Sequence, residues 1–531
     1  PSGSFRSDMP MKHPWPPNIV ERGGHITTRP LNDPSMMNKV GHIGHMNVHP
    51  GHRQAPPPPP LPHGGHNMIV GRCVRLDELS LAEHHLSLAA QAAGHGDLVT
   101  AQAILARLNR QILPTICSPN SQQPWHRAIF RFKEALATTC NLHTSSSSSP
   151  SSSSSSSAMI TDPPPPPPPL LGLDDTVHKI SAFKRLCELS PIPQFAHFVP
   201  NQAILDSTQG ESSLCILDFE LGFGGQWASF IEEFGRRGGK ELKITSVTIP
   251  APRCCTNKSE KINPSPGRLL EFGLARENLL EFAREVGLTL EVEAMPLEKI
   301  MEAMRRKAGN GEEVVAVNFG FCGMSRVMAY LQSSSSFTTV SSDHGNCMRE
   351  APAVSSFLSW LRRLEPRVVA VVEMEDESPL SPVSSSSRRH RFFQHKLESF
   401  ACVFESLQEA FMASSSFDLE SMYEIERLIF GSKIEDTVYE AFFNHHHHHQ
   451  QSSSHYSSGS SSHSISVLPW RVALLKAGFL PLPFSNAAES QASCLVKMNK
   501  HSGGFNFRKQ QENVLLLGWF NRPLISASAW V

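Results

Sequence analysis

From residue 211 onward, short apolar runs alternate with longer amphipathic segments, and this alternation constrains the fold more than any other feature of the sequence. Several of the runs are apolar almost throughout, which is typical of parallel strands that are covered on both faces. The order strand, helix, strand, helix predicts an α/β domain with a doubly wound parallel sheet. The predicted parallel strands are Leu214–Phe219, Leu242–Thr248, Thr289–Ala294, Val314–Phe319 and Arg367–Glu373.

The end of the chain departs from this alternation. Two further strand-like runs, Val514–Trp519 and Leu524–Trp530, are joined only by Asn521-Arg522-Pro523. A connection this short cannot hold a crossover helix, so the two strands are expected to be antiparallel. The predicted architecture is a Rossmann-like, methyltransferase-like sheet that ends in a C-terminal antiparallel hairpin. The predicted helices between the strands are Trp227–Arg236, Arg268–Val286, Val354–Leu364, Arg391–Met412 and Leu419–Phe442.

The residues before this domain carry helical periodicity, which predicts an α-helical cap of short packed hairpins. Asp97 has the side chain and position of a helix N-cap, and Pro124 suits a first helical turn. A fourth helix is predicted from Asp174 to about Leu189, with Val177, Ile180, Phe183 and Cys187 on its buried face. The predicted apolar stripes of the first three helices are Leu79, Ala82, Leu86, Ala89, Ala90 and Ala93; Leu98, Ala101, Leu105, Leu108 and Ile112; and Ile129, Phe132 and Leu136.

Low-complexity tracts divide the chain. Proline accounts for 41 residues and charged residues for only 18%, so part of the chain cannot build a core. We expect a disordered Pro/His-rich tail over residues 1–70 and a helical cap with a leucine-rich region over 71–205, interrupted by a Ser/Pro-rich linker at 144–173. The Rossmann-like core is predicted over 206–531, with a low-complexity insertion at 444–464.

The segment Asp218–Trp227 joins a buried strand to a helix through a glycine-rich turn, which is the outline of a nucleotide site. Its glycines, Gly222-Phe223-Gly224-Gly225, are compressed relative to GxGxxG, and bulky Trp227 follows where a small residue would let a ligand approach. The next strand ends Ser246-Val247-Thr248-Ile249-Pro250, without a carboxylate to hold a ribose. The turn is therefore predicted to be a scaffold element without a cofactor.

No catalytic or metal-binding constellation emerges from the rest of the sequence. There is no GxSxG, HExxH or Walker loop, and the cysteines have no metal-finger spacing. Asp218 and Glu373, at strand ends, are of a type that performs acid–base chemistry, although such residues more often cap a helix or pair with an arginine. A formal net charge of -1 gives no bulk attraction to nucleic acid or membrane, and no run of about 20 apolar residues predicts a membrane span.

Several motifs in a fixed order resemble those of one family over residues 74–531. Ala101–Asn109 resembles a first leucine-rich region, and Leu274–Leu279 falls in a second. Leu214, Cys215, Ile216, Leu217 and Asp218 stand at a VHIID-type motif, in which Leu replaces Val and Cys replaces His. Ser528, Ala529 and Trp530 form a SAW motif. With these motifs the chain resembles the plant GRAS transcriptional regulators, in particular the hairy-meristem branch of the Scarecrow-like proteins.

The resemblance implies a Rossmann-like core with a helical cap, no enzymatic activity, no cofactor and a nuclear location. It also implies assembly with transcription factors, with Wuschel-type homeodomain proteins as the expected partners, in shoot meristem maintenance and development. Homodimers, or heterodimers with other GRAS proteins, and contact with DNA directly or through a partner are further expectations.

Amphipathic helices in the cap offer a surface for such partners. We hypothesise that some apolar residues of these helices contact a partner or a second copy of the chain, namely Leu81, Leu88 and Ile104, which lie off the main stripes, and Leu105. The alternative for each is a place in the core, since apolar stripes usually face inward. Two other functions stay open at this point: a direct sequence-specific DNA-binding factor and, less favoured, an S-adenosylmethionine-dependent methyltransferase.

Overall fold

A computed structural model describes residues 81–111, 123–145, 173–249, 266–307, 314–333, 352–375, 385–414, 418–442, 470–499 and 503–531. All of them belong to one compact unit. The predicted tail at 1–70, most of the predicted linker and the predicted insertion at 444–464 lie outside the described residues. No helix within the described part of the chain is long and apolar enough to cross a membrane.

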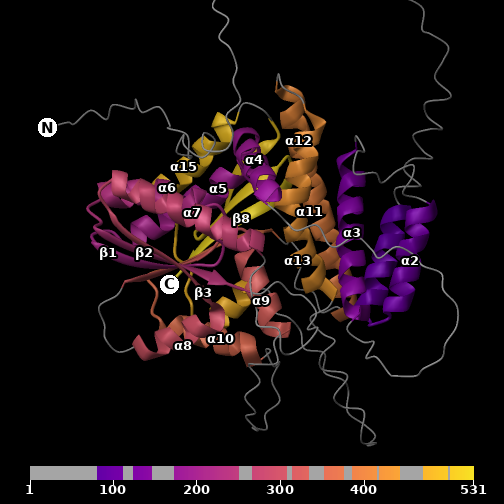
Figure 1. The fold of residues 1–531 in the computed structure, drawn as a ribbon, viewed down its shortest axis with the longest axis horizontal. Helices are drawn as coiled ribbons and strands as arrows, with labels where there is room; N and C mark the ends of the chain where they lie inside the picture. The colour runs from indigo at the N-terminus through magenta and orange to yellow at the C-terminus, as the bar shows by residue number, and fades with distance from the viewer. Residues whose placement is uncertain are drawn as a thin grey trace, which may run out of the picture. The chain divides into compact units, whose positions relative to one another are not determined.

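The core of the fold is one mixed sheet with the strand order β3-β2-β1-β4-β5-β8-β7-β6 (Figure 1). The first five strands of that order pair in parallel, and β8, β7 and β6 continue the sheet antiparallel. This confirms the predicted fold class. The strands are β1 Ser213–Asp218, β2 Glu241–Thr248, β3 Thr289–Pro296, β4 Val315–Phe319, β5 Val368–Met374, β6 Phe505–Gln511, β7 Val514–Trp519 and β8 Arg522–Trp530.

Alternate residues of each central strand pack against helices on opposite faces of the sheet. In β1, Leu214 and Ile216 face one apolar cluster, whereas Cys215 and Leu217 face the other. The strands are buried on both sides for this reason, which explains why their sequences are nearly continuous apolar runs. The helices of the α/β core are α5 Ile192–Ser207, α6 Gly225–Arg236, α7 Pro266–Glu285, α8 Leu297–Lys307, α9 Gly323–Ser333, α10 Pro352–Arg363, α14 Trp470–Lys476 and α15 Asn486–Met498.

The helical cap begins with a helix over residues 81–94, followed by α2 Leu98–Gln111 and α3 Pro124–Ser145. The predicted stripes are buried wherever the structure describes their side chains, except for half-buried Leu98. The predicted cap residue Asp97 accepts a hydrogen bond from the Thr100 amide at 3.0 Å. Sequence periodicity therefore identified the buried faces of these helices, and the capping side chain of Asp97 identified the start of α2.

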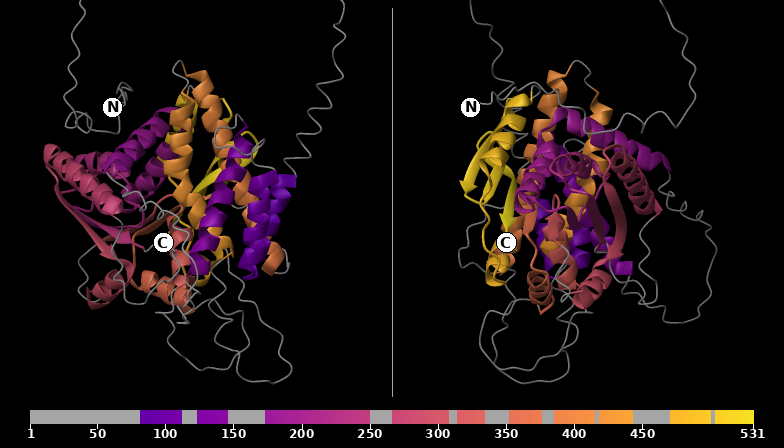
Figure 2. Two further views of the ribbon diagram at one scale, coloured as in Figure 1. Left: turned by 45° about the vertical axis from the view of Figure 1, so that its right-hand side comes forward. Right: turned by 90° about the vertical axis from the view of Figure 1, so that its left-hand side faces the viewer.

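The cap also includes helices from much later in the chain. Helix α3 packs along α11 Ser385–Ala413 and α13 Gly431–Phe442, as Figures 1 and 2 show. The single helix predicted at Leu419–Phe442 consists of three consecutive segments, which are α12 Leu419–Glu424, the π-helix η3 Ile425–Phe430 and α13. Arg127 of α3 donates through Nε to both carboxylate oxygens of Glu426 in η3, at 2.9 and 3.1 Å, and both side chains are buried.

One residue of a predicted helix face is wrong. Helix α4 Leu173–Leu189 exposes 53% of Val177, whereas Ile180, Phe183 and Cys187 are half-buried as part of the same face; the fully buried side chains are Ala182, Leu186 and Leu189. The helix is held between two polar contacts: Lys179 binds Glu271 of α7 at 2.8 Å, and His178 lies 3.0 Å from Glu424 of α12. Val177 lies next to His178 and Lys179 on the side of the helix that makes these polar contacts.

Candidate functional site

The glycine-rich turn lies where β1 ends and α6 begins, and β1 has β2 on one side and β4 on the other. The strand order reverses here, and doubly wound sheets bind their ligands at this position. Gly222 and Gly224 adopt positive φ angles of 55° and 78°, and Gly224 is the N-cap of α6. A Cβ atom at Gly224 would lie 3.0 Å from Leu279 of α7. The packing of α6 against α7 leaves little room for a side chain at this position, where the positive φ angle already favours glycine.

The side chain of Trp227, in the first turn of α6, is directed to the acid at the end of β1. Its indole is fully buried, and Nε1 donates a hydrogen bond of 2.9 Å to Oδ2 of Asp218 at the end of β1. The other carboxylate oxygen, Oδ1, accepts from Nδ2 of Asn318 at 2.8 Å. Burial raises the pKa of Asp218 to about 6, against the lowering effect of these two donors. Both oxygens are thus occupied by the chain itself.

The remaining polar groups at this position also bind one another. Gln226 accepts from Asn318 at 3.3 Å and donates to Oδ1 of Asn201 in α5 at 3.0 Å. Asn201 returns a hydrogen bond of 2.9 Å to the backbone oxygen of Gln226. We call this set the closed crevice: Asn201, Asp218, Gln226, Trp227 and Asn318. Neutral amides and an indole surround its single acid, and these hydrogen bonds stabilise the turn.

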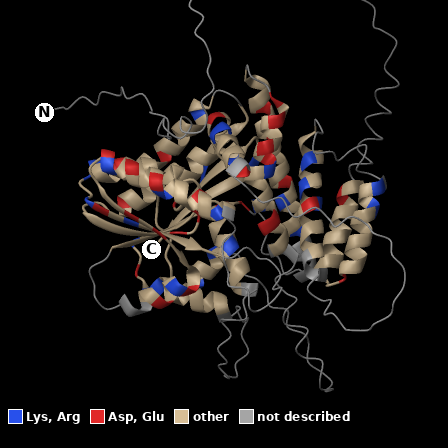
Figure 3. Cartoon of the chain, viewed as in Figure 1, with Lys and Arg blue, Asp and Glu red and all other residues tan. Residues whose placement is uncertain are grey.

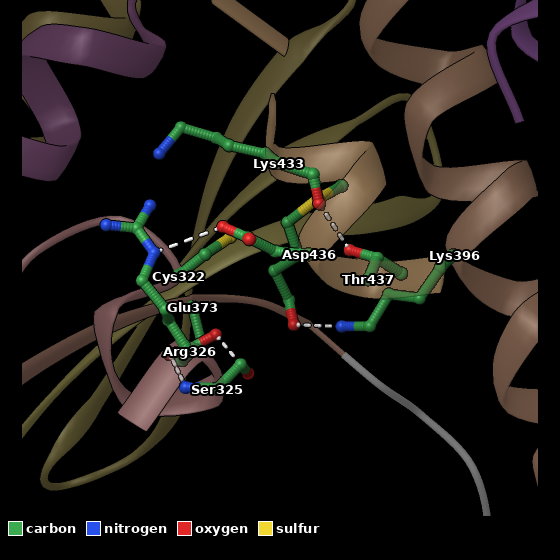
Figure 4. A pocket seen from close by; sticks show the side chains of 9 residues that line it. Cys322, Ser325, Arg326, Glu373, Lys396, Lys433, Asp436 and Thr437 are labelled. Atoms are coloured by element: carbon green, nitrogen blue, oxygen red, sulfur yellow. Dashed lines mark hydrogen bonds and ion pairs between the residues drawn. The ribbon is translucent and has the colours of Figure 1, made fainter. Parts of the chain in front are cut away.

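A second polar cluster lines a small hollow between α9, α11 and α13, at the carboxyl ends of β4 and β5 (Figure 4). Its volume of about 10 Å³ is room for about one water molecule. Each acid in the cluster has a partner: Asp436 accepts from Nε of Arg326 at 3.1 Å, and Glu373 accepts from the Ser325 amide and hydroxyl at 2.9 and 2.8 Å. Glu373 therefore binds donors at the start of a helix.

Lysines of the same cluster connect the cap to the sheet. Lys433 of α13 donates to Glu220, just after β1, at 2.6 Å, and to the backbone oxygen of Phe321 at 2.9 Å. Lys396 of α11 donates to the oxygen of Met374 at 2.9 Å. Burial raises the pKa of the Cys322 thiol to about 12, so no thiolate forms here at neutral pH. The cluster is a set of contacts that join the cap to the sheet. Of its residues only Glu373 stood out in the sequence, because the others are far apart along the chain.

The predicted motif residues occupy structural positions. All five residues of the VHIID-type motif, Leu214–Asp218, lie in β1 and are buried. The SAW residues end β8, where Trp530 is buried and donates from Nε1 to the Ser528 hydroxyl at 3.0 Å, while Ala529 pairs with Ala370 of β5. Strands β4 and β5 separate β1 from β8, so the two motifs do not form a common site.

The four predicted contact residues of the cap differ in exposure. Leu81 and Leu88 expose 47% and 38% of their surface on one face of the first helix, and Ile104 is half-buried against the core. Leu105 is only 4% exposed, so the hypothesis is wrong for this residue. Its spacing from Ala101 and Leu108 places it on the buried stripe of α2. Among the described residues, no group of three His, Cys, Asp or Glu side chains is placed to hold a metal ion.

The sheet order and the two-sided helical cover place this chain in the class of Rossmann-like α/β proteins, here with a helical cap and a crevice filled by its own side chains. The GRAS domain family model matches residues 82–531, and the chain belongs to this family. The rice structure described as SCL7 shares the fold with a TM-score of 0.51 and 21% identity, covering 85% of this chain and 99% of that one.

Relatives in the family carry Scarecrow-like and DELLA names. Scarecrow-like protein 6 of Arabidopsis thaliana is 29% identical over 82% of this chain and 60% of its own length. Scarecrow-like protein 15 of the same plant is also 29% identical, over 82% of this chain and 72% of that protein. The rice DELLA protein SLR1 is 26% identical over 65% of this chain and 48% of its own length. The chain thus spans about three fifths of Scarecrow-like protein 6.

Proposed function

We propose that this chain is a plant transcriptional co-regulator that works in the nucleus through contacts with DNA-binding transcription factors, without catalysing a reaction. The closed crevice carries the proposal. We infer that a nucleotide could bind at this turn only by displacing the buried ring of Trp227, which binds Asp218 at 2.9 Å. Family membership supports the same conclusion, since its relatives bear the names of Scarecrow-like and DELLA proteins.

The partner surface that we propose lies on the first cap helix, where Leu81 and Leu88 stand two turns apart on its exposed face. An exposed apolar row of this kind suits an amphipathic segment of another protein. Wuschel-type homeodomain proteins and other GRAS proteins are the partners to test first, and shoot meristem maintenance is the process. Lys and Arg are interspersed with Asp and Glu in Figure 3, which suits protein partners better than a DNA backbone.

A binding assay with a Wuschel-type homeodomain protein tests the proposal. The full chain with Leu81→Ser and Leu88→Ser is compared with the wild type and with Leu475→Ser, a control at an exposed leucine of α14. We expect the double variant to bind about tenfold more weakly, as loss of anchor residues does, and the control to bind normally. Equal binding by all three would reject this surface.

A salt titration separates co-regulation from direct DNA binding. A protein that neutralises phosphates loses affinity steeply as salt rises, because counterions are released on binding. We expect the chain alone to bind random-sequence DNA weakly. For the complex with its partner, DNA affinity should fall with salt concentration as steeply as it does for the partner alone. A steep slope for the chain alone would favour the direct DNA-binding function instead.

A further inference from the structure

The loop between β7 and β8 holds an aromatic residue in a backbone conformation that favours glycine. Trp519 pairs with Arg522, so the loop consists of Phe520 and Asn521. Phe520 has a φ angle of 49°, and among the described residues only Cys322 and Glu365 share this property without being glycine. Gly, Asn or Asp normally occupies such a position in a two-residue hairpin loop, and a bulky side chain there is an outlier.

The contacts of the loop do not require a phenyl ring. The Phe520 amide donates to the Gly504 oxygen at 2.7 Å, and its carbonyl accepts from Nη2 of Arg508 at 3.2 Å and from the Asn506 amide group. These are backbone groups of residue 520, so glycine would make the same bonds. The ring itself is 55% exposed and meets Trp519 edge-on, with the centroids 4.8 Å apart. Burial therefore does not explain why this strained residue is aromatic.

The charges around the ring suit a protein partner. Arg508 is exposed, and the structure gives it no carboxylate partner among the described residues. On the other side, Arg522 pairs with Glu398 at 3.2 Å, and Glu405 accepts from the Trp519 indole at 3.3 Å. Two guanidinium groups beside two carboxylates give no excess charge for a phosphate backbone. An exposed aromatic ring with an adjacent arginine is the composition of a protein-binding hot spot.

We propose that Phe520 and Arg508 form a second docking surface, separate from the first cap helix, for a partner protein that offers an apolar pocket to the ring and a carboxylate to the guanidinium. The proposal rests on the proposed function in assuming that the chain acts through protein contacts. Strain at residue 520 fits this role, because strained residues persist where function requires a particular side chain.

Phe520→Gly is the decisive variant, because it keeps every backbone hydrogen bond of the loop and relieves the positive φ. The full chain is used as bait in nuclease-treated shoot nuclear extract, as wild type, Phe520→Gly, Arg508→Gln and the control Leu480→Ser. Leu480 is exposed and bonds to Val531 at the opposite end of β8. We expect the recovered amount of at least one transcription factor to fall about tenfold with Phe520→Gly and to fall less with Arg508→Gln. The amount recovered with the control should be unchanged.

The recovered factor is then purified, and its Kd is measured with each variant to establish direct contact. The proposal is overturned if Phe520→Gly recovers the same proteins in the same amounts, or if it unfolds at a clearly lower temperature than the wild type, which would make the ring structural. If the effect of Phe520→Gly on recovery is seen in untreated extract and is absent after nuclease treatment, the ligand is nucleic acid and a protein partner is rejected. If proteins other than transcription factors depend on Phe520, the docking surface stands while the proposed function fails.

Discussion

Replacing Trp227 with phenylalanine removes one hydrogen-bond donor from the closed crevice and keeps an aromatic ring in the core. In the wild type, Nε1 of Trp227 binds Oδ2 of Asp218 at 2.9 Å, and both side chains are fully buried. The variant leaves that oxygen without its donor in a site that water does not reach. The energetic consequence depends on whether Asp218 is ionised, so the loss of stability should depend on pH.

The magnitude follows from the pKa of Asp218, which burial raises from 3.8 to about 6. Because the folded state binds this proton more tightly than the unfolded state, the group stabilises the fold at low pH. About 3 kcal/mol of that stability is lost as pH rises from about 4 to about 6. Without the indole donor the folded pKa rises further, so Trp227→Phe loses more stability above pH 6. A hydrogen bond to a charged group contributes about 1.5–3 kcal/mol and one to a neutral group about 1 kcal/mol.

Urea unfolding at about pH 5 and about pH 8 measures this difference. Relative to the wild type, Trp227→Phe should lose about 1–2 kcal/mol more at the higher pH. Asp218→Asn provides the matched control, because residue 218 then cannot ionise and Trp227→Phe should cost the same at both pH values. In the chain that keeps Asp218, Trp227→Phe could instead lower the free energy of unfolding equally at both pH values. That result would refute the assignment of Trp227 as the donor to a buried carboxylate.

Three further predictions concern the cap and the turn. Arg127→Met should destabilise the chain by about 3–5 kcal/mol at about pH 8, because it strands the Glu426 carboxylate. Since burial raises the pKa of Glu426 to about 7, the loss in urea unfolding should be smaller at about pH 5; no change with pH would contradict the buried pair. Leu105→Ser should lower stability by about 3 kcal/mol and Leu88→Ser by less than about 0.5 kcal/mol in the same assay, and similar losses would contradict their burial. Gly224→Ala should lower the free energy of unfolding by about 1–2 kcal/mol because residue 224 has a positive φ angle. The melting temperature should fall accordingly, and an unchanged melting temperature would contradict strain at this position.

Much of the fold is encoded in local patterns that the sequence displays directly. The central parallel strands are apolar because helices cover both faces of the sheet there, and the final hairpin has a connection too short for a helix. Strand β6 was missed because it lies at the edge of the sheet, where Arg508, Lys509 and Gln511 are exposed and no apolar run is needed. The π-helix within the predicted Leu419–Phe442 helix leaves no mark in the periodicity.

The site was only partly predictable, because its contacts join distant parts of the chain. The sequence indicated that Trp227 stands too close for a ligand, and the structure adds the indole bond to Asp218. Asn318 lies 100 residues from its partner Asp218, and Lys433 lies 213 residues from Glu220, so no spacing rule connects either pair. Leu105 shows the opposite error: its place on the buried stripe was visible in the sequence, and it was nevertheless assigned to the surface.

Calorimetric titration of the full chain with S-adenosylmethionine tests the central claim, that the chain's own side chains fill the ligand position of this fold. The wild type should give no binding heat at ligand concentrations up to about 1 mM, because the ring of Trp227 would have to leave the core to admit an adenosine. Saturable binding with a Kd of about 1–10 µM would contradict the claim and restore the methyltransferase function as a candidate.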